Sequence, residues 1–397
     1  MTYYVLPQIE YNITSNNLKI SFSDKNQNIR QYSLKKYLNK IKSLIDKHIK
    51  DWDIIKKYTN PYEFIHTNIP GQKISVSKYK PISRAFFKLY EIYNTHNLFN
   101  NNNPIKSFHL AEGPGGFIEA TQVIRNNPYD KYYGMTLIND DLNIPNWNKA
   151  SNLLKNNKNI LIEYGHDKKG NLYNYENLIY CKKRYQNSMD IVTADGGFDF
   201  SYDYNNQEKN AFRLIFTQIA YAITMQKYNG HFILKIFDIF QRYTIETLYL
   251  LSCFYKKIII SKPFTSRYAN SEKYIICKSF KYKDTTHIID KLSNILKIFD
   301  GVDFNEHSIF HILNIPLPNY YISQVFEINS ILVHQQIDNI LQTIKIITNK
   351  DRKHDKLHIL KNQNIQKCIE WCMNNKISYN HNYKTNNIFL GERIKNK

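Results

Sequence analysis

A glycine-rich turn at residues 112–117 is the first feature of this sequence that could bind a ligand. The turn reads Glu-Gly-Pro-Gly-Gly-Phe and follows a short apolar run at 107–111. Gly115 and Gly116 lack a Cβ, so the backbone there can approach a ligand closely. The spacing differs from a dinucleotide fingerprint, and no lysine follows as in a phosphate-binding P-loop. The turn therefore indicates either a nucleotide-type ligand site or a tight structural turn.

Four charged residues stand where they could orient a substrate or move a proton. Lys235 lies inside the apolar run 232–237, where an ammonium group is costly unless it reaches a polar site. Asp195 closes another apolar run, Lys88 falls in a helix-like stretch, and Glu272 opens a later run. Simpler explanations also exist, because Lys235 could snorkel to solvent and Glu272 could be an ordinary surface carboxylate.

The elements that must position these residues alternate between strand and helix patterns from 75 to 285. The apolar runs that predict strands are 107–111, 131–137, 159–163, 189–195, 230–237, 257–261 and 273–280. Strands separated by crossover helices indicate an α/β fold with a mostly parallel, seven-stranded sheet and helices on both faces. Ligands of such sheets bind at the carboxyl ends of the strands, where the glycine turn and Asp195 both lie.

The regions on either side of this alternating pattern differ from it. Residues 1–74 have the character of an N-terminal accessory region, and residues 286–397 have a mainly helical pattern. We therefore predict three parts, with the ligand-binding and catalytic chemistry confined to the domain 75–285.

Composition narrows the class of partner. The chain has 54 Lys and Arg against 34 Asp and Glu, a formal net charge of +20. This balance favours a polyanionic partner, although solvated surface lysines would give the same count. Hydrophobic residues make up 42%, which excludes wholesale disorder. We expect no membrane span, no secretory leader and, with five cysteines, a reducing compartment.

Several of these motifs together resemble the FtsJ/RrmJ-like 2′-O-ribose methyltransferases. The similarity is closest to the branch that acts on mRNA caps, which has viral members, and it covers roughly residues 80–280. It is carried by the segments 110–117, 133–137, 195–198, 230–238 and 262–272. The resemblance implies a Rossmann-like methyltransferase fold, the cofactor S-adenosylmethionine, and methylation of a ribose 2′-hydroxyl near the 5′ cap of mRNA, giving cap-1.

The catalytic residues carry over from the family's Lys-Asp-Lys-Glu tetrad. The resemblance places the tetrad on Lys88, Asp195, Lys235 and Glu272. A ribose hydroxyl is a poor nucleophile that must be positioned and relieved of its proton. Lys235 is implied to be the base or the orienting group, and the two carboxylates fix its geometry. The sulfonium donor has a neutral leaving group, so no metal is needed in principle and we expect none.

The cofactor contacts carry over to the glycine turn and to residues that follow later strands. The implied contacts are Glu112, Gly113, Pro114, Gly115, Gly116, Phe117, Thr136, Asp167 and Asp195. Asp167 and Asn171 align about equally well with the adenine-contacting acid, and Asp167 is preferred because a carboxylate accepts a hydrogen bond from the adenine amino group. Arg84 and Arg267 adjoin the tetrad motifs and could hold RNA phosphates, with ordinary surface arginine an equal alternative.

Two other functions compete with cap methylation. An rRNA or tRNA 2′-O-methyltransferase is disfavoured by the long flanking regions, and a non-catalytic RNA-binding scaffold is disfavoured by the intact tetrad. The predicted partner is the capped 5′ end of mRNA, with other capping or transcription proteins as further candidates. The sequence is rich in Asn, Lys and Ile, as expected of an AT-rich genome. Together with the similarity of its motifs to viral members of the family, this bias predicts an origin in a large DNA virus. It therefore also predicts a location in the host cytoplasm or the virion.

Overall fold

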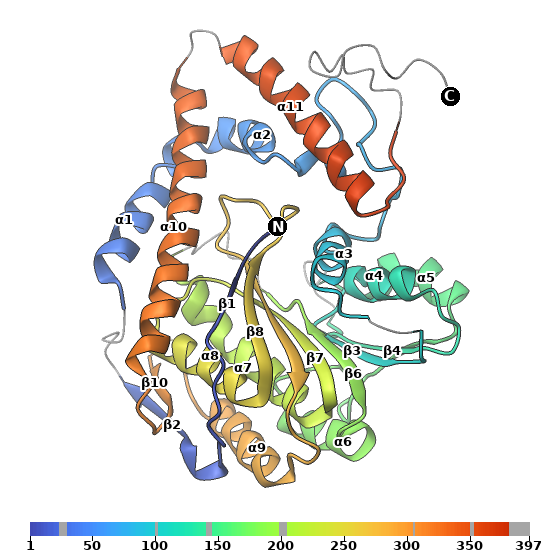
Figure 1. The fold of residues 1–397 in the computed structure, drawn as a ribbon, viewed down its shortest axis with the longest axis vertical. Coiled ribbons are helices and arrows are strands. Elements are labelled where there is room, and N and C mark those ends of the chain that lie inside the picture. Colours follow the sequence, from blue (N-terminus) through green and yellow to red (C-terminus); the bar gives the residue numbers. More distant parts are fainter. Residues whose placement is uncertain are drawn as a thin grey trace. The chain divides into compact units, whose positions relative to one another are not determined.

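The computed structural model (Figure 1) forms two compact units. Unit 1 comprises Met1–Ile41 and Pro81–Ile337, and unit 2 comprises Lys42–Lys80 and Asp338–Lys397. The structure describes the chain except for residues 24–29, 100–101, 140–144, 198–204, 305, 350–352 and 381–397. Among the described residues, no helix has the length and hydropathy to cross a bilayer.

Unit 1 is built around an eight-stranded sheet of order β1-β8-β9-β7-β6-β3-β4-β5. Its strands are β1 (Thr2–Val5), β3 (Lys106–Leu110), β4 (Lys131–Met135), β5 (Ile160–Ile162), β6 (Met189–Ala194), β7 (Gln226–Ile236), β8 (Tyr255–Lys262) and β9 (Lys273–Phe280). Neighbours from β5 across to β7 pair in parallel, whereas β9 pairs antiparallel with both β7 and β8. The predicted Rossmann-like α/β fold is confirmed, with all seven predicted strands present.

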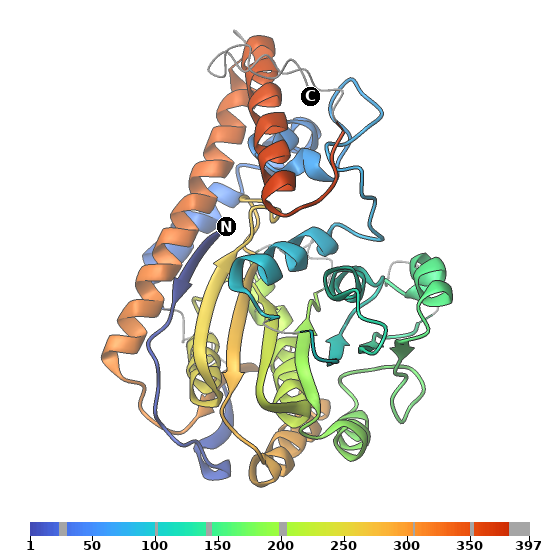
Figure 2. The same ribbon diagram turned by 45° about the vertical axis from the view of Figure 1, so that its right-hand side comes forward.

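Helices cover both faces of this sheet (Figures 1 and 2). They are α3 (Ala85–His96), α4 (Gly116–Arg125), α5 (Ser151–Asn156), α6 (Tyr175–Tyr185), α7 (Gln207–Met225), α8 (Arg242–Phe254) and α9 (Thr286–Asp300). α3 packs on α4, whereas α7 contacts α6, α8 and α9 as well as β6 and β7. Because α7 has neighbours all around it, nearly every side chain from Ala211 to Met225 is buried.

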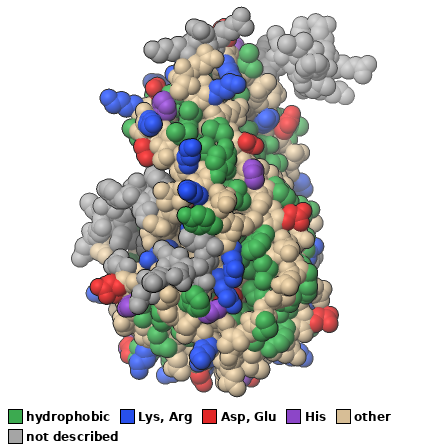
Figure 3. Space-filling model, turned by 90° about the vertical axis from the view of Figure 1, so that its left-hand side faces the viewer, with side chains coloured by type: hydrophobic (Ala, Val, Ile, Leu, Met, Phe, Trp, Pro, Cys, Tyr) green, Lys and Arg blue, Asp and Glu red, His purple; other side chains and the backbone are tan. Residues whose placement is uncertain are grey.

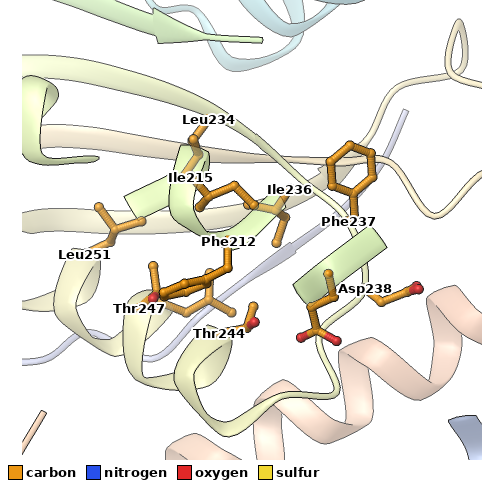
Figure 4. A pocket seen from close by; sticks show the side chains of 11 residues that line it. Phe212, Ile215, Leu234, Ile236, Phe237, Asp238, Thr244, Thr247 and Leu251 are labelled. Carbon is orange, nitrogen blue, oxygen red and sulfur yellow. The ribbon is translucent and has the colours of Figure 1, made fainter. Parts of the chain in front are cut away.

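A small cavity lies between α7, the end of β7 and α8 (Figure 4). Its volume is about 10 Å³, and apolar side chains such as Phe212, Ile236 and Leu251 form most of its wall. Asp238 and Thr244 also line it. A space of this size holds at most about one water molecule, so this cavity is a packing defect of the core and not a nucleotide site.

The eighth strand of the sheet comes from the N-terminal region. β1 pairs antiparallel with β8, from Thr2 opposite Lys262 to Val5 opposite Ile259. It therefore covers a sheet edge that β8 would otherwise present to solvent. Further along the chain, β2 (Leu18–Ser23) pairs antiparallel with β10 (Ser308–Leu313) in a separate two-stranded sheet.

Unit 2 is formed by α2 (Ile49–Thr59), α11 (Lys353–Asn374) and the second half of α10 (Asn319–Thr348). Its helices are joined by buried polar contacts. Thr59 Oγ1 lies 2.7 Å from Thr343 Oγ1, and Asn364 Nδ2 donates to Tyr58 O at 2.7 Å. The helical character expected for 286–397 is therefore found in α9, α10 and α11, with β10 as the strand among them.

The two units group the chain differently from the predicted parts 1–74, 75–285 and 286–397. The N-terminal 41 residues belong with the large sheet, and the C-terminal region contributes to both units. The physical reason is that β1 completes one sheet and β2 needs β10 as its partner, which no local sequence pattern reveals. The range 75–285 remains our proposal for the catalytic domain.

A buried histidine links β3 to β6 at the centre of the sheet. His109 is fully buried, and its two ring nitrogens are hydrogen-bonded at 2.8 Å to Ser107 Oγ and Thr193 Oγ1. Burial lowers the pKa of His109 to about 3. The imidazole is therefore neutral at physiological pH and serves the strand pairing rather than proton transfer.

We predict that acid destabilises unit 1 through this residue. The unfolded imidazole takes up a proton near pH 6.5, whereas folded His109 stays neutral down to about pH 3. The stabilisation is therefore complete above about pH 6.5 and is lost as the pH falls, by roughly 1.4 kcal/mol per pH unit. His109→Gln should flatten the pH dependence of the unfolding free energy measured by chemical denaturation between about pH 7.5 and about pH 5.

Part of the slope should survive in that variant, because burial also lowers the pKa values of His96 and His231 to about 4. A pH slope identical to that of the unsubstituted protein would contradict the assignment to His109.

Candidate active site

Four charged side chains from distant segments meet at the carboxyl edge of the sheet. Lys88 comes from α3, Asp195 follows β6, Lys235 lies near the end of β7, and Glu272 directly precedes β9. Lys88 Nζ lies 2.8 Å from Glu272 Oε2, and Lys235 Nζ lies 3.2 Å from Asp195 Oδ1. The structure thus brings together the four residues predicted to be catalytic, as two adjacent ion pairs.

Strand alternation sets the direction of Lys235. Its neighbours Leu234 and Ile236 are buried in the core, so Lys235 projects from the opposite face of β7. Its Nζ donates a second hydrogen bond to Asp195 O at 2.7 Å. Tyr274 OH donates to Asp195 Oδ1 at 2.8 Å. Lys235 and Asp195 keep 12% and 15% of their side chains exposed, so both are fixed yet within reach of a ligand.

The second ion pair is more deeply enclosed. Ser266 Oγ donates to Glu272 Oε1 at 2.6 Å while Lys88 occupies the other carboxylate oxygen. Burial alone would raise the pKa of Glu272, but Lys88 foremost, with Lys235 and Lys262, outweighs it and holds that pKa well below its usual range. Burial in turn lowers the pKa of Lys88, with Glu272 and Asp195 opposing. Glu272 is therefore a permanent carboxylate.

The loop 263–272, which carries Glu272, is held by two buried side chains that sequence reasoning missed. Glu91 accepts hydrogen bonds from the amides of Phe264 and Thr265 at 2.9 and 3.2 Å. Lys262 Nζ donates to the carbonyl oxygens of Asn270 and Glu272 at 2.6 and 2.7 Å, and burial lowers its pKa to about 7. A signal existed for Glu91, because it lies three residues after Lys88 and so shares its helix face.

The glycine turn connects β3 to α4. Gly115 has φ +111°, a left-handed conformation that favours glycine. A Cβ on Gly113 would lie 2.3 Å from Pro145 O, and one on Gly116 would lie 2.1 Å from Ser83 Oγ. The turn is therefore closely surrounded by other parts of the chain, and its partly exposed positions are Gly113 and Pro114.

Two of the predicted cofactor contacts are used by the protein itself. Glu112 Oε1 accepts hydrogen bonds from the amides of Phe117 and Ile118, both at 2.8 Å, which caps the start of α4. The Phe117 side chain is 1% exposed and packs 6.1 Å from the Tyr274 ring. These side chains position the glycine turn, which leaves the backbone of the turn to face a ligand.

The remaining predicted contacts surround this turn. The Thr136 hydroxyl lies 3.0 Å from the position that a Cβ on Gly113 would take. The Thr136 carbonyl oxygen lies 2.2 Å from the position that a Cβ on Gly170 would take. Thr136 therefore lies between the glycine turn and the loop after β5. In that loop Asp167 Oδ1 accepts from Lys169 N at 2.8 Å, and Asn171 Oδ1 accepts from Tyr173 N at 3.0 Å. Both side chains stabilise local turns, so the adenine contact stays a prediction.

Two buried polar atoms on either side of the glycine turn fit a polar ligand. Among the described residues, neither Ser83 Oγ nor Trp147 Nε1 has a hydrogen-bond partner. Ser83 lies against Gly116, and the Trp147 ring lies against Gly115 and Gly134. Buried polar groups in proteins are normally satisfied. An aromatic ring and two unpartnered donors next to the glycine turn are groups suited to contact a nucleoside.

The two arginines predicted to hold RNA lie close to the tetrad. Arg84 Nη2 donates to Thr265 O at 3.2 Å, and the Arg84 guanidinium is near enough to help lower the pKa of Lys88. Arg267 lies in the loop 263–272 and is partly exposed. The structure therefore places Arg84 near the tetrad and Arg267 in the loop that carries Glu272, and their role toward RNA remains a prediction.

This chain belongs to the FtsJ-like methyltransferases. The family model, described as "FtsJ-like methyltransferase", matches residues 81–280, which is half of the chain and contains all four tetrad residues.

Named relatives are similar over parts of the chain. A zebrafish (Danio rerio) cap-specific mRNA (nucleoside-2′-O-)-methyltransferase 2 is 27% identical over 344 residues, covering 80% of this chain and 43% of the relative. A mouse (Mus musculus) cap-specific mRNA (nucleoside-2′-O-)-methyltransferase 1 is 34% identical over 178 residues, covering 43% of this chain and 21% of the relative. The chain thus spans less than half the length of either.

A viral protein is also similar. The "probable methyltransferase EP424R" of African swine fever virus (isolate Pig/Kenya/KEN-50/1950) is 27% identical over 278 residues, covering 65% of this chain and 61% of that protein.

We predict that Gly115→Ala weakens binding of the methyl donor by about tenfold or more while the fold survives. The reason is that a Cβ forces this residue away from φ +111° and shifts the backbone of the turn. Gly71→Ala is the matched control, because Gly71 also has positive φ (+83°) but its Cβ would meet nothing within 4 Å. Calorimetric titration gives the affinity, and thermal melting gives the stability. Equal affinity of both variants for the methyl donor would mean that the glycine turn does not bind it.

Proposed function

We propose that this protein methylates a ribose 2′-hydroxyl near the 5′ cap of mRNA, using S-adenosylmethionine. The observation that carries the proposal is the pair of ion pairs Lys88–Glu272 and Lys235–Asp195 at the carboxyl edge of the sheet. Cap-specific mRNA methyltransferases among the relatives support the choice of substrate.

S-adenosylmethionine, when bound, supplies an electrophilic methyl group. We assign it to the glycine turn, with Gly113, Gly115 and Gly116 contributing backbone, and with Thr136, Asp167 and Asp195 on the flanking loops. Ser83 and Trp147 are additional candidates, because their buried donors lack partners among the described residues. Several chemically unrelated segments would therefore enclose one nucleoside, which suits a cofactor that must be held in a single orientation.

The four residues of the tetrad have different proposed roles toward the RNA hydroxyl. Asp195 fixes the Lys235 amine through two contacts, at 2.7 Å and 3.2 Å, and a third direction of that amine is left for the ribose oxygen. Lys88 and the permanently ionised Glu272 enclose the same space from the other side. As the hydroxyl oxygen gains the methyl group, the sulfonium leaves as a neutral thioether and the hydroxyl releases its proton, with Lys235 as the base or as the group that orients the hydroxyl. Positioning of the two reactants supplies much of the acceleration.

RNA binding would use charge around this site. Arg84 and Arg267 are proposed to contact phosphates of the nucleotides beside the reacting ribose. The net charge of +20 supports a polyanionic substrate. The well-formed ion pairs favour a catalyst over the alternative of a non-catalytic scaffold, since burying four charges without chemistry is an expensive way to build a binding surface.

The finer predictions stay proposals. They are an origin in a large DNA virus, an action in the host cytoplasm, and contact with other capping or transcription proteins. Similarity to the African swine fever virus protein supports the first.

We predict that Lys235→Ala abolishes methyl transfer with little loss of cofactor or RNA affinity, because the lost interaction belongs to the transition state. Lys235→Arg should also fail, since a guanidinium stays protonated and is broader. Lys227→Ala, on the same strand but exposed and paired with Asp190, is the control. Single-turnover rates on capped RNA measure the effect. A rate in the alanine variant above about a tenth of the unsubstituted rate would mean that Lys235 is not the catalytic lysine.

The substrate itself can be tested with labelled methyl donor and matched capped and uncapped RNAs of one sequence. We expect label only in capped RNA, at the ribose of the first transcribed nucleotide, because the proposed product is cap-1. Label at internal riboses of uncapped RNA would favour the rRNA or tRNA alternative instead. Absence of label from every RNA, with the cofactor bound, would favour the scaffold.

A further inference from the structure

A second, basic groove lies in unit 1 outside the tetrad and the glycine turn. Its volume is about 490 Å³, and its polar lining is Lys19, Ser21, Arg242, His311 and Asn314. One wall is the two-stranded sheet of β2 and β10, and the other is the start of α8. The β2 and β10 residues fall outside the range 81–280 that the family model matches. The accessory regions therefore add this groove to the methyltransferase domain.

A buried carboxylate fixes the two walls against each other. Glu246 is fully buried and accepts from the amides of Ile312 and Leu313 at 2.8 and 3.2 Å. The same carboxylate binds Arg242 Nε at 2.9 Å and His311 Nδ1 at 3.1 Å. Glu246 thus holds β10 against α8. It also fixes the side chains of Arg242 and His311 at the groove.

The groove has unused capacity for an anion. Lys19 is exposed and has no ion pair or hydrogen bond of its side chain among the described residues. Ser21 Oγ is buried and likewise lacks a partner within the described part of the chain. Lys19 and Arg242 together carry two positive charges against the single negative charge of Glu246. An anionic oxygen bound here would satisfy the Ser21 hydroxyl and the surplus charge at once.

The groove lies within reach of the reacting centre. Arg242 follows Lys235 by seven residues, and a fully extended chain of that length spans at most about 25 Å. Both residues belong to unit 1. Lys235 and α8 lie on opposite faces of the sheet, because Leu234 and Ile236 pack against α8. An RNA chain would therefore pass around the carboxyl edge of the sheet to reach the groove from Lys235.

From these observations we propose that the groove binds the phosphodiester backbone of the RNA substrate, a few nucleotides away from the reacting ribose. This inference rests on the proposed function. Phosphates are the expected ligand, because the described lining offers the cations Lys19 and Arg242 and the Ser21 hydroxyl, whereas no Phe, Tyr or Trp lines it for bases to stack on. On the face drawn in Figure 3, Lys and Arg side chains are interspersed with hydrophobic and acidic ones.

The test compares RNA binding by charge variants on a long and a short substrate. Lys19→Glu reverses one charge, and Arg242→Gln removes another while keeping a donor for Glu246. Lys257→Glu is the control, since Lys257 is exposed near the start of β8, at the edge of the sheet opposite Lys235. Equilibrium affinities are measured by fluorescence anisotropy over a range of salt concentrations, with capped RNA of about 20 nucleotides and with a capped trinucleotide.

We expect the variant that combines Lys19→Glu with Arg242→Gln to bind the long RNA at least about tenfold more weakly than the unsubstituted protein. The slope of log affinity against log salt should fall by about 0.7 for each lost phosphate contact. Affinity for the trinucleotide and for the methyl donor should not change. The single-turnover rate at saturating long RNA should also be retained, because neither residue touches the reacting atoms.

Three results would overturn the proposal. One is a loss on the long RNA no greater than in Lys257→Glu. Another is an equal loss on both RNAs, which would indicate a general charge effect. The third is unchanged RNA affinity together with lost binding of polyglutamate, which would indicate an acidic protein partner. If the unsubstituted protein does not methylate capped RNA but the length-dependent loss is found, the groove stands and the proposed function falls.

Discussion

The architecture of the carboxyl edge of the sheet depends on the mutual neutralisation of two lysines and two carboxylates. Each charge is largely removed from water, and an isolated buried charge costs several kcal/mol. Lys88 with Glu272, and Lys235 with Asp195, offset that cost only because α3, β6, β7 and the loop before β9 converge within hydrogen-bonding distance. Any shift of one element would leave a charge unpaired, so the ion pairs constrain the sheet and its helices as much as the sheet positions them.

The surrounding polar groups can be understood as supports for that arrangement. Glu91 and Lys262 hold the loop 263–272 by its backbone, and Ser266 orients Glu272. On the cofactor side, Glu112 caps α4 and so fixes the glycine turn. These residues use their charge on backbone groups, which keeps the functional side chains themselves available to ligands.

A buried carboxylate that binds backbone amides also organises the groove formed with the accessory regions. Glu246, on a helix of the methyltransferase domain, accepts hydrogen bonds from β10, which comes from the C-terminal region. One buried carboxylate therefore joins a strand outside the family domain to a helix inside it, and it holds the side chains of Arg242 and His311 at the groove. The chain thus forms a second polar surface by adding strands to a helix of the family domain, and the four residues of the tetrad are not part of it.

The sequence by itself predicted the fold class and the seven strands from β3 to β9, and the family resemblance proposed the four residues of the tetrad. Those features depend on neighbouring residues in the sequence. An apolar run predicts a buried strand, and a Gly-Gly turn predicts a close approach of the backbone. Lys235 stands out because the residues on both sides of it are apolar. Element boundaries were less certain. β7, for example, begins at Gln226 rather than 230. Residues 227–229 are exposed and carry no apolar signal, and Gln226 pairs with Met189 across a register irregularity.

Only the tertiary structure decided which residues partner one another across long stretches of chain. β1 joins β8 more than 250 residues away, and β2 joins β10 nearly 290 residues away. The assignment of Glu112 to helix capping and of Phe117 to the core was equally hidden, since a motif does not show which direction a side chain takes. The groove around Glu246 required folding for the same reason: its charges come from three separate segments, and their sum has meaning only where those segments meet.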